Sequence, residues 1–486
     1  MTHRQRVTLL AAILGSGVAT LDGTIVNVAL PAIERDLGGG LTAQQWVVNA
    51  YLLALGSLIL IGGSLGDIYG ERRVFAIGVA AFGVFSVACA LAPTIGVLIA
   101  ARTLQGAAAA LLVPSSLAII IGAFSTQERG PAIGSWTAWG GIAAVIGPLA
   151  GGVIVDQTSW RWVFALNVPL VAATIVFVLA AVPRTPRVVG RRVDVLGAVL
   201  CAAGLGGIVF ALIEQPRLGW SSPAIVVSLV GGVLAFAGFL AYERHAAQPM
   251  LRLSLFARRN FSVGNVETLA MYAGLAILFF YLVIFLQQVA GYSALEAGLA
   301  TLPTTLIMFA LSSRFGALAD RYGPRLFMGA GPLIAAAGIL LLLRTGLNTS
   351  YLADVLPAVI VFSLGLTMTV APLTAAVLAD ADEWDAGIAS AVNNAVARVA
   401  GLVGVPLAGI VAASTLVGDT FAADASSVDA FHRVVVICAA LVAAGGAVGA
   451  LGIVNPRRVV EAKRCAGGQL VGVPEPAVQT SRADMA

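Results

Sequence analysis

Long apolar stretches, separated by short polar or Gly/Pro-rich turns, run along almost the whole chain. A helix that crosses the hydrocarbon core of a bilayer needs about 20 consecutive, mostly apolar residues. By this measure the pattern predicts fourteen spanning helices, near residues 8–31, 45–66, 74–93, 95–122, 132–156, 163–182, 194–214, 223–242, 261–289, 297–314, 326–344, 352–378, 387–413 and 434–454. We therefore expect an all-α polytopic membrane protein.

The composition agrees with this expectation. Of the 486 residues, 59% are hydrophobic and 11% are charged, and the mean hydropathy is +0.96. Soluble domains carry about 25% charged residues. A soluble enzyme and a protein with a single membrane anchor are both excluded.

Sequence motifs for nucleotide or metal chemistry are missing. Lys463 is the only lysine, and it does not belong to the Gly-Lys-Ser/Thr motif of an ATP-binding P-loop. The three histidines, His3, His245 and His432, lie far apart and form no metal-ligand motif. We therefore expect no metal and no cofactor, and an ion gradient as the energy source of any transport.

The arginines give the expected orientation. If the N-terminus is inside, the predicted cytoplasmic segments hold 21 of the 28 Lys and Arg residues and the outer segments hold 5. Cytoplasmic loops of membrane proteins carry this excess of positive charge, so both termini are expected in the cytoplasm. The Ala/Arg-rich, lysine-poor composition is typical of GC-rich bacterial genomes, which favours a bacterial cytoplasmic (inner) membrane.

An internal repeat divides the chain. Residues 63–72 return as residues 316–325 with six of ten positions identical, and residues 148–151 return as residues 406–409. These offsets equal about eight spans, which predicts two pseudo-symmetric six-helix bundles with two inserted helices between them. The expected divisions are a first bundle over 1–193, linker helices over 194–260, a second bundle over 261–454 and a disordered cytoplasmic tail over 455–486.

The repeated segment resembles the G-x-L-x-D-x-x-G-x-R loop signature of the major facilitator superfamily. Other motifs resemble that superfamily or its fourteen-span drug:proton antiporter subfamily: Leu21–Pro31, Arg102-x-x-Gln105-Gly106, Gly147-Pro148-x-x-Gly151-Gly152 and residues 286–298. The resemblance extends from about residue 8 to residue 454. It implies two bundles that expose a central site to each side of the membrane in turn. Ile68 and Glu71 depart from the pattern, because the family often has basic residues there.

The two repeated loops are expected to latch the bundles together on the cytoplasmic side. Their aspartates can accept hydrogen bonds from a helix N-terminus or from the loop arginines, and their glycines permit tight turns. The alternative, that the loops are only positively charged anchors, does not explain the repeated aspartate. The candidate latch residues are Asp67, Gly70, Arg72, Asp320, Gly323 and Arg325.

Asp22 and Arg102 form the most informative pair. With Pro31 taken as the outer end of the first helix, Asp22 is about 13 Å deep and Arg102 about 10 Å deep, at 1.5 Å per residue. Charged side chains are costly in hydrocarbon, so both should face the bundle interior and each other. Asp22 is our candidate proton carrier, and the alternative is a fixed ion pair that joins two helices.

Glu267, about six residues into the ninth predicted helix, is a second candidate for proton coupling or for attracting a cationic substrate. Two structural alternatives stay open. Glu267 can snorkel to the inner interface, or it can pair with Arg398, for which we expect a structural role.

Further candidates line the region between the bundles. Asn27 and Gln105 can hydrogen-bond a substrate, with helix packing as the alternative. Phe279 and Tyr281 belong to an apolar cluster that suits lipophilic compounds. In the fifth helix, the motif is interpreted as a hinge or as close packing, and its residues are Gly140, Gly147, Pro148, Gly151 and Gly152.

Together these features and the resemblance predict a proton-coupled exporter of amphipathic, preferably cationic, drugs or antibiotics. Its partners would be a small lipophilic substrate, protons and the lipid bilayer, with no nucleic acid, no ATP and a monomeric state. One alternative is a dedicated exporter of a single endogenous metabolite or lipid. A lower alternative is a transport-inactive membrane sensor or scaffold.

Overall fold

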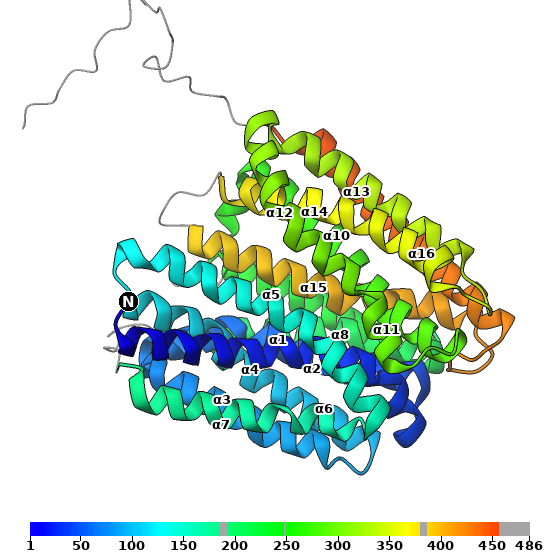
Figure 1. The fold of residues 1–486 in the computed structure, drawn as a ribbon, viewed down its shortest axis with the longest axis horizontal. Helices are drawn as coiled ribbons and strands as arrows, with labels where there is room; N and C mark the ends of the chain where they lie inside the picture. Colours follow the sequence, from blue (N-terminus) through cyan, green and yellow to red (C-terminus); the bar gives the residue numbers. More distant parts are fainter. Residues whose placement is uncertain (184–192, 247–248, 250, 380–385, 456–486) are drawn as a thin grey trace, which may run out of the picture. The chain divides into compact units, whose positions relative to one another are not determined.

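Helices account for all the regular secondary structure in the described part of the chain (Figure 1). The computed structural model describes residues 1–183, 193–246, 249, 251–379 and 386–455. Within these residues, 13 helices are long and apolar enough to cross a membrane, and counting the bent second helix gives 14. The predicted all-α polytopic class is therefore confirmed. The predicted tail lies, apart from Asn455, outside the described residues.

The first six spans are α1 to α7. Their bounds are α1 His3–Leu37, α2 Gly40–Tyr69, α3 Glu71–Ala90, α4 Ile95–Ala123, α5 Thr126–Gln157, α6 Arg161–Ala165 and α7 Asn167–Ala181. Helices α6 and α7 make up a single span. Within this set, α4 packs against α2 and α3, and α1 packs against α5 and α7.

The last six spans repeat this packing pair by pair. They are formed by α10 Arg259–Ile284 with η2 Phe285–Val289, α11 Ala294–Ala300 with α12 Leu302–Tyr322, α13 Pro324–Leu340 with η3 Leu341–Arg344, η4 Tyr351–Val355 with α14 Leu356–Ala379, α15 Ala386–Ala413 and α16 Ala425–Gly452. Here α14 packs against α12 and α13, and α10 packs against α15 and α16. The repeat seen in sequence is thus a repeat of helix packing.

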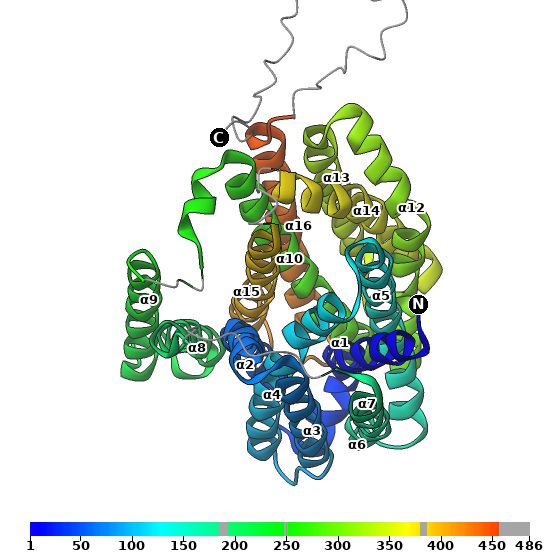
Figure 2. The same cartoon turned by 90° about the vertical axis from the view of Figure 1, so that its left-hand side faces the viewer.

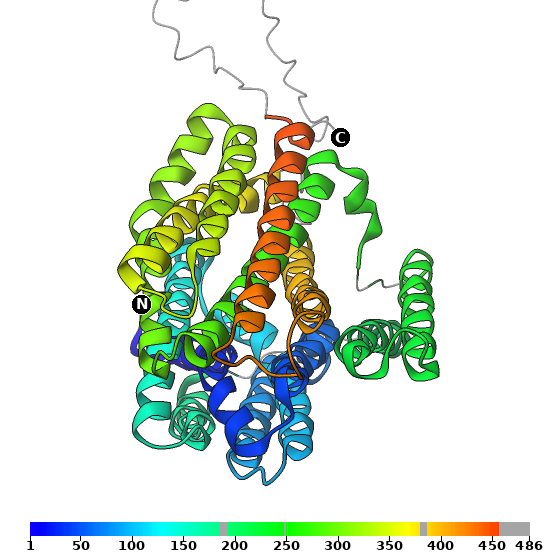
Figure 3. The same cartoon turned by 90° about the vertical axis from the view of Figure 1, so that its right-hand side faces the viewer.

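Two inserted helices, α8 Val195–Leu218 and α9 Pro223–Glu243, precede the short helix η1 Leu253–Ala257. Helix α8 packs against α2 and α15, one from each bundle, and α9 packs on α8 (Figures 2 and 3). A hydrogen bond of 2.9 Å from the indole of Trp46 to the Glu214 carboxylate joins α2 to α8. The inserted pair therefore covers the seam between α2 and α15.

Helix α1 is longer than predicted. A capping box formed by Thr2 and Gln5 starts it, and Gly38, with φ of 73°, ends it after Leu37. Pro31 lies inside this helix, so taking it as the outer end was wrong. Counted from Leu37, Asp22 is about 22 Å along the helix, at 1.5 Å per residue.

Glycines allow several helices to cross with almost no space between them. A Cβ atom built on Gly338 of α13 would lie 2.2 Å from the amide nitrogen of Phe362 on α14. By contrast, nothing lies within 4 Å of a Cβ built on Gly141 of α5. Only the first position lacks room for a side chain.

We expect Gly338→Ala to lower the free energy of unfolding by about 1–3 kcal/mol, because the added methyl group must push the two backbones apart. The measurement is thermal unfolding of the purified protein in one detergent. The control, Gly141→Ala, should unfold at or above the wild-type temperature, since alanine favours helix over glycine. Equal stability of both variants would contradict the tight α13–α14 crossing.

Candidate functional site

A buried ion pair connects α1 to α4. Asp22 and Arg102 are both within 1% of full burial, and the Arg102 Nη1 atom donates to Asp22 Oδ2. The other carboxylate oxygen accepts from Gln105 Nε2 at 3.0 Å and from Asn167 Nδ2 at 2.8 Å. Three donors from α4 and α7 therefore surround one carboxylate.

The guanidinium of Arg102 is held on several sides. Its Nε atom donates to the Val47 carbonyl at 3.1 Å, and Nη1 also donates to Gln105 Oε1 at 2.7 Å. Its central carbon lies 4.2 Å from the ring centroid of Tyr51. Cation–π contact with an aromatic face stabilises a desolvated guanidinium. Since Val47 and Tyr51 belong to α2, the network joins α1, α2, α4 and α7.

A serine forms an outer layer of the network. Ser86 Oγ on α3 accepts from Gln105 Nε2 at 2.8 Å and from Asn167 Nδ2 at 3.3 Å. Asn167, Ser86 and Tyr51 were not predicted from the sequence. Asn167 carried a usable signal, because it is the only amide side chain in the predicted span 163–182. Serine and tyrosine are common in spans, so nothing in the sequence singled out Ser86 or Tyr51.

Glu267 lies elsewhere, on α10 of the second bundle. Its side chain is fully buried, and neither carboxylate oxygen has a hydrogen-bond partner among the described residues. Its Oε2 atom points toward α16, 2.3 Å from a Cβ built on Gly449. Burial excludes snorkelling, and no ion pair with Arg398 occurs in the described part of the chain. Both structural alternatives for Glu267 were therefore wrong.

The other candidate substrate contacts separate in space. Asn27 is half-buried, and its Oδ1 atom has no partner within the described ranges. Phe279 packs edge to face on Phe362 inside the second bundle, with ring centroids 6.2 Å apart. Tyr281 is fully buried, and its hydroxyl accepts from Gln45 Nε2 at 2.9 Å. Tyr281 thus forms a contact between bundles that the sequence did not predict.

Several hydrogen bonds join the two bundles at the end where α1 and α5 finish. Asp156 accepts at 2.9 Å from the amide of Ala294 and at 2.8 Å from the amide of Leu295. The Val28 carbonyl accepts from Gln287 at 3.0 Å, and Asp419 accepts from the amides of the first turn of α2. We call these contacts, together with Gln45–Tyr281, the outer seal, since the orientation expected from the arginines would place this end outside.

The fifth-helix motif lies beside this seal and packs against a helix of each bundle. Gly147 and Gly151 pack against α1, where built Cβ atoms would lie 2.2 Å from Thr24 and 2.6 Å from Ile25. Gly152 faces α11 of the other bundle, 2.4 Å from the Cα atom of Leu295. The Pro148 carbonyl similarly lies 2.6 Å from a Cβ built on Gly298.

Gly140 does not share this role. Nothing lies within 4 Å of a Cβ built there, so the close approach expected at this position is absent from the structure.

The repeated loops turn as expected and bind within their own bundles. Gly70 and Gly323 have φ of 93° and 90°, a region that favours glycine. Arg72 donates to the Leu179 carbonyl at the end of α7, and Arg325 donates to the Ala450 carbonyl at the end of α16. These bonds satisfy carbonyls that a helix end leaves unpaired. Asp67 is half-buried and Asp320 is exposed.

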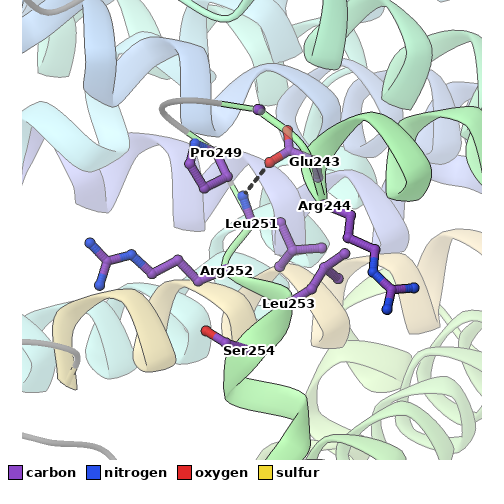
Figure 4. Close-up of a pocket in the computed structure, with 8 residues that line it drawn as sticks. Glu243, Arg244, Pro249, Leu251, Arg252, Leu253 and Ser254 are labelled. Carbon is purple, nitrogen blue, oxygen red and sulfur yellow. Dashed lines mark hydrogen bonds between the residues drawn. The ribbon is translucent and has the colours of Figure 1, made fainter.

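Two pockets lie outside the ion-pair network. The first, of about 740 Å³, lies where α9 leads into η1, and its lining includes Glu243, Arg244 and Arg252 (Figure 4). The Glu243 carboxylate accepts from the Leu251 amide at 2.9 Å, which ties this connection together. The second, of about 390 Å³, lies at the outer seal beside Asp156.

Comparison with known proteins gives relatives over most of the chain. It is 39% identical to "Puromycin resistance protein pur8" of Streptomyces alboniger, over 82% of this chain and 80% of that protein. It is 34% identical to "Multidrug resistance protein Stp" of Mycobacterium tuberculosis, over 86% and 77%. It is also 34% identical to the "Tetracenomycin C resistance and export protein" of Streptomyces glaucescens, over 85% and 77%.

Solved structures share the fold. An inward-facing, unoccupied bacterial homolog of the human lysosomal transporter Spinster matches with a TM-score of 0.65 and 15% identity, covering 93% of this chain and 97% of that one. The inward-open xylose transporter XylE from E. coli matches with a TM-score of 0.60 and 13% identity, covering 92% and 96%. The profile of the Major Facilitator Superfamily matches residues 12–405. The chain belongs to this superfamily, as its repeated loop and fifth-helix motif indicated.

Proposed function

We propose that the protein is a proton-coupled exporter of amphipathic organic compounds that works by alternating access. The observation that carries this proposal is the fully buried Asp22 carboxylate, with donors from Arg102, Gln105 and Asn167. Ionisable groups inside a membrane are costly, and their usual roles include proton relay. The names of the relatives, which refer to antibiotic resistance and export, support export as the direction.

Asp22 can act as a switch because Arg102 has other partners. Protonation of Asp22 removes the negative charge that Arg102 faces. The guanidinium then still keeps the Val47 carbonyl, Gln105 Oε1 and the Tyr51 ring. The protonated state therefore weakens the link between α1 and α4. It does not leave Arg102 wholly unpaired, which would be strongly destabilising for a buried charge.

The network is connected to the outer seal through its own helices. Helix α1 carries both Asp22 and Val28, and α2 carries Val47 as well as Gln45. We propose that proton loading on Asp22 shifts α1 against α4 and so loosens the seal. The substrate site then opens outward, and the repeated loops latch the opposite end.

The direction of opening follows from the arginine bias. If the arginine-rich end is cytoplasmic, the sealed end is external and the protein is inward-facing. This orientation, with both termini inside a bacterial cytoplasmic membrane, is part of the proposal. A monomer suffices, because both bundles belong to one chain.

Glu267 is proposed as a second protonation site rather than as a substrate contact. An ionised carboxylate there would have no donor among the described residues, so the buried position accommodates the neutral acid. Its orientation toward α16 keeps it from attracting a cationic substrate. The expected preference for cations therefore loses its main physical support.

A second candidate function is dedicated export of one endogenous compound. The names of pur8 and of the tetracenomycin C protein each refer to one antibiotic, whereas Stp is named for multidrug resistance. Both candidates use the same proton chemistry at Asp22.

We expect Asp22→Asn to lower proton exchange at least about tenfold while the protein still folds, because asparagine keeps the shape and one acceptor oxygen of the side chain but cannot carry a proton. The measurement is proton release from proteoliposomes with an imposed pH gradient, on addition of lipophilic probes of each charge. Asp36→Asn is a matched control on the same helix, since Asp36 forms an exposed pair with Arg161 and should leave exchange unchanged. Full exchange in Asp22→Asn, with loss in Glu267→Gln, would move the proton site to Glu267.

We also expect Asp156→Ala to loosen the outer seal, since the amides of Ala294 and Leu295 lose a charged acceptor. Hydrogen–deuterium exchange should rise several-fold in the peptide around residue 294 and in the peptide around Leu41. Asp429→Ala, which removes an exposed pair with Arg433, is the control. A rise confined to the first peptide would mean that Asp156 does not hold the bundles together.

A further inference from the structure

Arg398 occupies the middle of α15, on the side that faces the first bundle. It lies twelve residues, or about 18 Å, from the start of the helix at Ala386. Arg398 and Gly409 are eleven residues apart, which is close to three full turns, so they share one helix face. Gly409 packs against the side chain of Gln45 on α2, 2.0 Å from a Cβ built on the glycine. Arg398 therefore points toward α2, further from the outer seal.

No described residue neutralises this arginine. Its Nε atom is buried without a hydrogen-bond partner, and no hydrogen bond or ion pair of its guanidinium occurs within the described ranges. The titratable group from the first bundle that interacts with it electrostatically is Tyr51. The Tyr51 hydroxyl donates to the Ala19 carbonyl, and its ring lies against Arg102. Tyr51 thus supplies no negative charge.

The carboxylates in the spans are used elsewhere. Asp22 is surrounded by Arg102, Gln105 and Asn167. Glu267 faces α16 inside the second bundle. The Asp22–Arg102 pair has no net charge, so Arg398 makes the region between the bundles positive. A guanidinium at this depth is costly unless an anion compensates for it.

A second unused polar group lies on the facing helix. Asn49 of α2 is fully buried, and neither its Oδ1 nor its Nδ2 atom has a partner among the described residues. It follows Gln45 by one turn, so it lies on nearly the same face of α2 as the residue that meets Gly409. Buried amides nearly always have hydrogen-bond partners. Arg398 and Asn49 together therefore leave donors unused in the region where α2 faces α15.

We infer that Arg398, assisted by Asn49, binds an acidic group, a carboxylate or an ionised phenol, on the exported compound. Arginine matches this chemistry, because its planar fork donates two parallel hydrogen bonds to a carboxylate. This inference rests on the proposed function and names its substrate class. It also replaces the expected structural role of Arg398 and the expected preference for cations. An anion that leaves while a proton enters moves charge in one direction, so an inside-negative potential favours the exchange.

The test is equilibrium binding to the full-length protein in lipid nanodiscs. Three fluorescent probes share one anthracene ring system and differ in charge: the carboxylate, the neutral carboxamide and the cationic aminomethyl compound. The wild type should bind the carboxylate about tenfold or more tightly than the carboxamide, as expected for a charge-assisted bidentate contact. Arg398→Gln should abolish this preference and leave carboxamide affinity within about twofold.

Two further variants control for folding and for net charge. Arg398→Lys should keep a reduced preference of about threefold, since lysine keeps the charge but loses the fork. Arg433→Gln removes an exposed arginine from α16 and should bind all three probes as the wild type does. Equal affinity of the wild type for the three probes, tighter binding of the cation, or an unchanged preference in Arg398→Gln would each overturn the inference.

The outcome is separable from that of the proposed function. A carboxylate preference that depends on Arg398, without proton exchange in proteoliposomes, would support the anion site and contradict proton-coupled export. Proton exchange, together with binding that does not depend on Arg398, would support proton-coupled export and contradict the anion site.

Discussion

The structure depends on one ion pair placed where water does not reach it. Asp22 and Arg102 are both buried, and four helices meet at their hydrogen bonds. In such surroundings a charge that loses its counter-charge is strongly destabilised. In the proposed function, a change in the protonation of Asp22 is therefore answered by movement of α1, α4 or their neighbours. This constraint turns a local proton transfer into a rearrangement of helices.

The outer seal makes that rearrangement useful for transport. It consists of a few polar contacts, such as Asp156 with the start of α11, together with glycine-mediated packing along α5. For the two bundles to separate at this end, these polar contacts and the buried apolar packing that both bundles share must part together. The inserted helix α8 contacts both bundles and has its polar anchor, Trp46–Glu214, on α2. In the proposed function, this geometry lets α8 stay with the first bundle while α15 moves.

Much of the fold was predictable because a membrane restricts the answer. Apolar length gave the spans, and the repeated segment gave the paired bundles, whose helix packing also repeats. Depth counting brought Asp22 and Arg102 together, although Pro31 proved to lie inside α1. Those features depend on position along the chain, which a sequence records directly.

The direction in which side chains point was harder to predict. In helices that are apolar all round, periodicity does not show which face meets which neighbour. Glu267 lies toward α16, and no atom lies close to Gly140. Gly147 packs against the first bundle, whereas Gly152 packs against the second. Asn167 and Ser86 became visible only once α7 and α3 were placed beside α1. Rotation about the helix axis is set by tertiary packing, so it required the structure.

The central claim is that the charge on Asp22 controls the outer seal, and a distance across that seal tests it most directly. Spin labels at Leu91 and Val417, both exposed and on different bundles, would report this distance by double electron–electron resonance in nanodiscs, after replacement of the native cysteines. We predict a narrow distribution in the wild type at neutral pH and a shift to longer distances in Asp22→Asn. An unchanged distribution in Asp22→Asn would contradict the account.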